Sequence, residues 1–240
     1  MVTRRSRLAT LGKPAPQAGL MLYIAAGEPW NDWAALAFAE KDVDDSRTER
    51  VSPSRPNEDL LVINPELRLP ALSDRELLLT GARVIVEYMD ERYPHPRLLP
   101  QDPAGRAKVR MVLEQFATEL FPVLQEALAS KSAKAKSPLA QQVLNSARWF
   151  GGKSYFLGVE YTQADLAWAV WLKGVQSLGL KLPENTARYR DKLAARPVLA
   201  AYFLSARLRA SANQLSCGRS APPVFTARMP VHSARLPSRH

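Results

Sequence analysis

The chain has 240 residues, of which 46% are hydrophobic, and this length is enough for one large or two small packed units. No run approaches the roughly 18 apolar residues that a membrane span requires, so the pattern excludes a transmembrane protein. The single cysteine, Cys217, excludes an intramolecular disulfide and a cysteine-based zinc cluster. We expect no metal site, and few cysteines fit a cytoplasmic protein.

The formal net charge of +10 is concentrated at the two ends of the chain. Residues 1–19 carry four basic and no acidic side chains, and residues 211–240 carry four arginines and no acid, which leaves +2 on residues 20–210. We expect a disordered basic arm at 1–19 and a disordered basic tail at 211–240. The folded body is not expected to bind nucleic acid specifically, although the tails could contact RNA, DNA or an acidic protein.

Residues 20–95 alternate short apolar runs with helix-like stretches. The run Leu20–Ile24 has the length of a strand that is buried on both faces. In chain order we expect a strand at 20–24, a helix at 33–41, an edge strand at 46–51, a helix at 57–62, strands at 68–72 and 76–79, and a helix at 84–90. The order β-α-β-α-β-β-α predicts a thioredoxin-like α/β domain.

Residues 102–210 show helical periodicity only, and 96–101 form the linker that precedes them. A long helix opens at Asp102-Pro103, and Pro122 is expected to break or kink it. The low-complexity stretch 130–137 is interpreted as a loop. Thr162 and Asp165 form a capping signal for an almost wholly apolar helix at 166–176, which we expect to be central. Further helices are predicted at 184–194 and 197–209.

A small α/β unit followed by an all-helical unit resembles the glutathione S-transferase architecture. The specific match is Ile63-Asn64-Pro65 followed by Leu69-Pro70-Ala71-Leu72, together with the capping motif at Thr162–Asp165. The resemblance implies that Pro70 is cis and that the backbone of Leu69 lies where these enzymes bind the γ-glutamyl group of glutathione.

The residues that such enzymes need for chemistry are missing from the sequence. The stretch 25–32, which includes Trp30 and Asn31, has no Ser, Cys or Tyr to stabilise a glutathione thiolate. Where the family has Glu-Ser, this chain has Gly81-Ala82. We therefore expect no catalytic residue and no cofactor. The alternative is a divergent glutathione S-transferase that acts on small electrophiles, with the Asn31 amide as a weak donor and glutathione bound.

The segment 86–100 resembles the stringent starvation protein A family through its Tyr93-Pro94-His95-Pro96-Arg97 sequence. The resemblance implies a non-catalytic, dimeric protein that binds RNA polymerase holoenzyme and its sigma factor and modulates transcription under starvation or stress. Partner binding is assigned to Pro94, His95, Pro96 and Arg97. Three prolines close together restrict the backbone and lower the entropy lost on binding. The alternative is a loop that only links two domains.

Overall fold

The computed structural model describes residues 19–52, 54–130, 132–150 and 154–204. The predicted basic arm (except Gly19) and the predicted basic tail lie outside the described residues, as does the end of the last predicted helix. The first part of the chain forms one four-stranded mixed sheet in the order β2-β1-β3-β4. Its strands are β1 (Leu20–Ala25), β2 (Arg47–Val51), β3 (Ala71–Asp74) and β4 (Leu77–Thr80).

β1 lies inside the sheet, parallel to β2 and antiparallel to β3. Alternate side chains of a strand point to opposite faces, and both faces of β1 are covered. Leu22 and Ile24 pack with Phe38 and neighbouring side chains on one face, whereas Tyr23 packs with Leu60 on the other. The apolar run of β1 is thus explained by burial on both sides.

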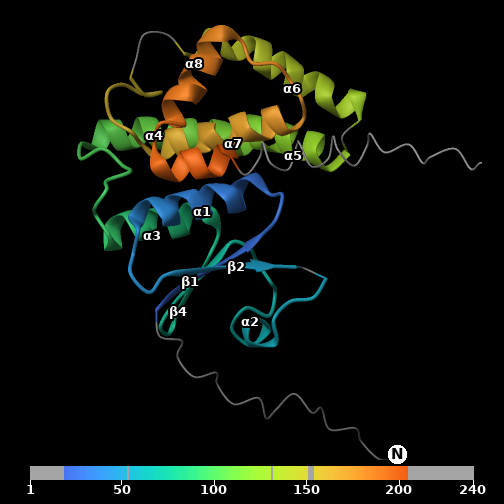
Figure 1. The fold of residues 1–240 in the computed structure, drawn as a ribbon. Coiled ribbons are helices and arrows are strands. Elements are labelled where there is room, and N and C mark those ends of the chain that lie inside the picture. The colour runs from blue at the N-terminus through green and yellow to red at the C-terminus, as the bar shows by residue number, and fades with distance from the viewer. Residues whose placement is uncertain (1–18, 53, 131, 151–153, 205–240) are drawn as a thin grey trace, which may run out of the picture.

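Two layers of helices produce this burial (Figure 1). The helices of this unit are α1 (Pro29–Lys41), α2 (Glu58–Ile63) and α3 (Ala82–Arg92). α1 and α3 cover the face of the sheet that is turned toward the helical unit, and α2 covers the opposite face. The predicted thioredoxin-like α/β domain, followed by helices only, is therefore confirmed.

Two predicted boundaries in this unit were wrong by three residues or more. α1 begins at Pro29 and not at Trp33, because the Glu28 carbonyl already accepts hydrogen bonds from the following turn and proline suits a first helical position. β3 begins at Ala71 and not at Arg68. The Asn64 side chain binds both the N–H (3.2 Å) and the carbonyl (3.0 Å) of Arg68, so this backbone is paired locally and not in a ladder.

The described residues of the second unit contain helices, joined by turns and loops, and no strand. Its elements are α4 (Pro103–Gln115), a π-helical turn η2 (Phe116–Leu120), α5 (Phe121–Ser130), α6 (Ala133–Ser146), α7 (Gln163–Ser177), α8 (Glu184–Leu193) and a helical segment at 197–204.

Pro122, where the sequence predicts a break or a kink, lies just after the π turn η2. The helix does not stop there, because η2 connects α4 to α5 without a loop. Proline has no N–H to donate to the carbonyl four residues earlier, and the wider π turn changes the hydrogen-bond pattern immediately before it. Of the two outcomes predicted at Pro122, the break does not occur, and the helix is instead perturbed by the π turn next to the proline.

The predicted loop at 130–137 was also wrong, because α6 begins at Ala133. The Ser132 hydroxyl accepts the Ala135 N–H at 3.2 Å and so caps the helix. Alanine and lysine are strong helix formers, and the low complexity of this stretch concealed that preference.

The two units share one core, which is built around α7. Its first ten residues after the cap are all buried. α1 packs on the sheet through Phe38 and on the helical unit through Trp33, whose indole N–H donates to the Gln163 carbonyl at 3.1 Å. α1 is therefore buried between two layers and has almost no polar face (Figure 1).

Candidate functional site

The predicted partner-binding loop, 94–97, joins the end of α3 to the region before α4. All four residues are exposed, and the His95–Pro96 peptide bond is cis. Leu98 and Leu99, which follow, are buried in the shared core. The loop thus presents exposed side chains from a segment whose C-terminal end is fixed by packing.

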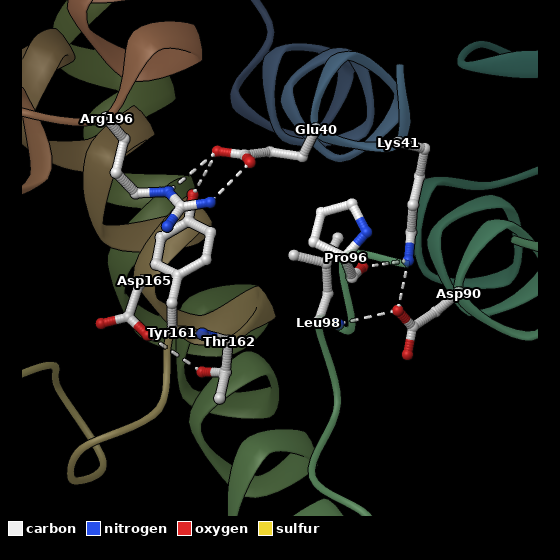
Figure 2. Close-up of polar contacts among 9 residues, drawn as sticks. All are labelled: Glu40, Lys41, Asp90, Pro96, Leu98, Tyr161, Thr162, Asp165 and Arg196. Carbon is white, nitrogen blue, oxygen red and sulfur yellow. Dashed lines mark hydrogen bonds and ion pairs between the residues drawn. The ribbon is translucent and has the colours of Figure 1, made fainter. Parts of the chain in front are cut away.

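A buried ion pair lies beneath this loop (Figure 2). The Lys41 ammonium, at the end of α1, is 2.6 Å from the Asp90 carboxylate of α3 and donates to the Pro96 carbonyl at 2.7 Å. The same Asp90 oxygen accepts the Leu98 N–H at 2.8 Å. The Pro96 carbonyl in the loop and the Leu98 N–H just after it are therefore bonded to charged side chains, and charge-assisted hydrogen bonds are among the stronger ones.

The loop is also connected to the helical unit. The Leu98 carbonyl accepts the N–H of Gln163, the first residue of α7, at 2.8 Å. Leu98 thus uses its N–H toward the α/β unit and its carbonyl toward the helical unit. The base of the loop is attached to both.

A pocket of about 240 Å³ opens beside the loop. It is lined by Asp90, Glu91, Pro94, Arg97, Leu99 and Arg106. The Arg106 side chain donates to the Pro100 carbonyl at 2.9 Å, which fixes the position of this guanidinium. The lining therefore combines two apolar residues, Pro94 and Leu99, with charges of both signs, and its chemistry suits a polar protein surface or a small polar group.

The glutathione-like positions lie at the other end of the α/β unit. The Leu69–Pro70 peptide bond is cis, and the Pro70 carbonyl accepts the Gly81 N–H at 3.1 Å. Pro70 is buried, whereas Leu69 is half-buried. The backbone framework expected from the resemblance is present.

The side chains around this framework serve the fold. Asn31 is fully buried; its amide oxygen accepts the Ala25 N–H at 2.9 Å, and its amide nitrogen donates to Glu28 at 2.8 Å. The ring of Trp30 lies 4.7 Å from that of Phe121, in an edge-to-face contact across the two units. Asn31 closes the turn after β1, and Trp30 fills space between the units.

Neither Gly81 nor Ala82, at the start of α3, has a polar side chain to offer a ligand. Gly81 is the N-cap residue with φ +91°, and it makes no side-chain capping bond. Ala82 is buried. The first turn carries no acidic residue, so Gly81 and Ala82 provide backbone groups only.

Thr162 and Asp165 form a capping box at the start of α7. The Asp165 carboxylate accepts the Thr162 N–H at 2.8 Å and the Phe156 N–H at 2.8 Å, and it also accepts the Tyr189 hydroxyl. Burial raises the pKa of the Asp165 carboxyl, and these hydrogen bonds oppose the shift. The motif therefore organises the centre of the helical unit.

The described residues, with their gaps, contain no group of three His, Cys, Asp or Glu side chains placed to bind a metal ion. In the same part of the chain, no helix has both the length and the hydropathy to span a membrane.

Known proteins resemble this chain in both sequence and structure. The family model for the N-terminal domain of glutathione S-transferase matches residues 22–97. The stringent starvation protein A homolog of Coxiella burnetii is 30% identical over 172 residues, which cover 70% of this chain and 82% of the relative. The homolog of Pasteurella multocida is 37% identical over 148 residues, covering 60% and 69%. The chain belongs to the stringent starvation protein A family.

A solved structure with the same fold is a diazinon-metabolizing glutathione S-transferase of the silkworm Bombyx mori. The TM-score is 0.68 at 18% identity, with 80% of this chain and 98% of that chain covered. At this identity the likeness establishes the glutathione S-transferase fold alone. The chain is thus a stringent starvation protein A-type protein on that fold.

The buried charges of Lys41 and of its neighbour Glu40 were not predicted from the sequence. The Glu40 carboxylate is 2.8 Å from an Arg196 guanidinium nitrogen and accepts the Tyr161 hydroxyl at 3.0 Å (Figure 2). The guanidinium also lies over the Tyr161 ring, 3.8 Å from its centroid. Burial and the nearby Glu40 charge raise the pKa of Tyr161 above 10.0.

One signal in the sequence could have revealed these residues. Glu40 occupies the apolar face that Trp33, Leu36 and Ala37 define at helical spacing, and a charge on such a face requires a partner. The partner of Glu40, Arg196, lies 156 residues further along the chain, and the partner of Lys41, Asp90, lies 49 residues beyond Lys41.

Proposed function

We propose that this chain is a non-catalytic binding protein that associates with RNA polymerase holoenzyme and its sigma factor through the 94–97 loop and thereby modulates transcription under starvation or stress. The observation that carries the proposal is the loop itself: its backbone is anchored by Lys41 and Asp90 while its four residues are exposed. Membership of the stringent starvation protein A family supports it.

The absence of catalysis is supported by what occupies the glutathione-like positions. A thiolate needs a nearby hydroxyl, thiol or other donor to stabilise its charge. Asn31 is instead buried and bonded to Ala25 and Glu28, and the Gly81-Ala82 helix start offers no side-chain donor or acceptor. Binding the charged ends of glutathione without partners would cost several kcal/mol.

The loop has the physical properties of a recognition element. Its exposed prolines restrict the backbone, so little conformational entropy is lost when a partner binds. His95 and Arg97 supply polar contacts, and the adjacent 240 Å³ pocket supplies a concave surface that both Pro94 and Arg97 line. We place the protein in the cytoplasm, where RNA polymerase acts.

Retention by purified bacterial RNA polymerase holoenzyme tests the proposal. The wild-type protein should be retained, and His95→Ala should weaken retention about tenfold because an exposed contact side chain is removed. His95→Gln is the matched control, because it keeps a hydrogen-bonding side chain at the same position, and it should lose less than His95→Ala. Failure of the wild-type protein to bind would refute the proposal.

A divergent glutathione S-transferase is the second candidate, because the cis Leu69–Pro70 framework is present. A ligand that binds only the native state must raise the melting temperature. We expect no rise with millimolar glutathione; a clear rise, with turnover of an aryl halide, would favour the transferase.

We also propose that the protein is a homodimer through the outer faces of α3 and α4. Val84 and Met111 are 54% and 71% exposed, and they lie beside two ion pairs that connect these helices, Arg83–Glu114 and Glu87–Arg110. An apolar patch bordered by charges of both signs can pair with a copy of itself. Light scattering should give twice the chain mass for wild type and a monomer for Val84→Glu/Met111→Glu.

A further inference from the structure

Lys41 is buried at the base of an exposed loop. Its side chain has 0% exposure, and its ammonium is bonded to Asp90 and to the Pro96 carbonyl. A buried ammonium requires partners, and here one of its two partners is a backbone group of the loop. That carbonyl belongs to the residue directly after His95.

Asp90 holds the backbone two residues after Pro96, at Leu98. Its Oδ1 atom receives both the Lys41 ammonium, at 2.6 Å, and the Leu98 N–H, at 2.8 Å. The ion pair therefore fixes the loop at Pro96 and at Leu98, on either side of Arg97. Figure 2 shows these contacts between the ends of α1 and α3.

Stability alone does not account for a buried ion pair in this place. Desolvation of the two charges offsets much of their attraction, so apolar replacements of such pairs are often equally stable. Leu98 and Leu99 already anchor this segment in the core. What the pair adds is a set of directed bonds, which determine where the loop backbone lies and leave its side chains free.

We propose that Lys41 is a positioning residue for the partner-binding loop, acting through the Pro96 carbonyl and, with Asp90, through the Leu98 N–H. The proposal rests on the function proposed above for that loop. Lys41 does not itself contact the bound protein. It keeps the backbone on both sides of Arg97, and therefore also His95, in one arrangement.

Glu40 provides a matched control for a test of Lys41. It neighbours Lys41 at the end of α1, is also buried, and also forms an ion pair, but its partners Arg196 and Tyr161 lie in the helical unit. Lys41→Met and Glu40→Gln each remove one buried charge from the same helix turn. Only the first removes a bond to the loop.

The first readout is local and needs no partner. In Lys41→Met, the ¹³C shift of the Pro96 carbonyl should change, and NMR order parameters of the His95 and Arg97 amides should fall from about 0.85 to below about 0.6. Glu40→Gln should leave both at wild-type values, even if its melting temperature falls. Unchanged loop relaxation in Lys41→Met, or equal changes in both variants, would overturn the proposal.

The second readout is retention by RNA polymerase holoenzyme, measured per folded protein. We expect Lys41→Met to lose about tenfold because the loop is no longer preorganised, and Glu40→Gln to match wild type. Equal retention of Lys41→Met and wild type would also overturn the proposal. If wild type itself is not retained, the proposed function fails, and the relaxation data alone decide the role of Lys41.

Asp90→Asn is the second variant if Lys41→Met does not fold. It keeps an amide oxygen for the Leu98 N–H but removes the charge that pairs with Lys41. The same loss of order at His95 and Arg97 is expected, and its absence would count against the proposal in the same way.

Discussion

Asp165 is the side chain on which we expect the helical unit to depend most. Its fully buried carboxylate is the acceptor for the N–H groups of Phe156 and Thr162 and for the Tyr189 hydroxyl. The Thr162 hydroxyl also donates to it, at 3.1 Å. Asp165→Ala leaves these four donors without an acceptor. A buried unpaired donor costs about 1–3 kcal/mol, and the Phe156 N–H is only partly buried. We therefore expect a loss of about 4 kcal/mol, a large share of the roughly 5–15 kcal/mol typical of a folded domain.

Urea unfolding followed by circular dichroism measures this loss as a change in the free energy of unfolding. Asp165→Asn retains one carbonyl oxygen and should lose about half as much. Asp191→Ala is the control, because Asp191 is 63% exposed and its pair with Arg190 should contribute less than about 1 kcal/mol. A loss below about 1 kcal/mol for Asp165→Ala would show that the donors find other acceptors and would refute the reasoning.

Three further outcomes are expected. Gly174→Ala should lower the free energy of urea unfolding by about 1–3 kcal/mol, because the added Cβ would lie 2.6 Å from Leu124 Cδ1. Leu124→Val in the same protein should recover part of the loss, and strictly additive losses from the two substitutions would contradict this packing. Gly81→Ala should lower the free energy of unfolding by about 1 kcal/mol in the same assay. The cause is the φ of +91° alone, because the added Cβ would meet nothing within 4 Å, and a neutral result would mean that the backbone relaxes. Burial raises the pKa of Tyr161 and Tyr189 in the folded chain, so their contribution to stability is complete below the unfolded pKa of 10.0 and is lost as the pH rises above it. Tyr161→Phe should therefore flatten the fall in melting temperature above pH 10, and an unchanged dependence of melting temperature on pH would contradict the assignment.

The fold could be predicted because its strongest patterns are local. The apolar run at Leu20–Ile24, the Leu69-Pro70 pair and the Thr162–Asp165 cap each concern a few neighbouring residues. The first lies in a strand and the third at the start of a helix, as expected, whereas Leu69-Pro70 has the expected cis peptide bond but precedes β3. The errors also have local causes. The stretch 130–137 was interpreted by its composition, whereas the Ser132 cap and helix-forming alanines and lysines decided its structure.

The candidate loop could be located from its prolines, but its support could not. Lys41 and Asp90 are 49 residues apart, and neither position alone distinguishes a buried ion pair from two solvated charges. The same holds for Asn31: the sequence allowed it to be a donor toward a ligand, and only its bonds to Ala25 and Glu28 assign it to the fold.

The sequence by itself determined the order of elements, the missing hydroxyl or thiol after β1, and the presence of the Pro-His-Pro segment, because these depend on residue identity and short-range pattern. The tertiary structure decided which charges meet. Lys41 and Glu40 are adjacent in the chain, yet Lys41 bonds to the loop through Asp90 and Pro96, whereas Glu40 bonds to Arg196 of the helical unit. Successive residues of a helix point about 100° apart, so the two charges diverge, and their partners are set by long-range packing that no short pattern encodes.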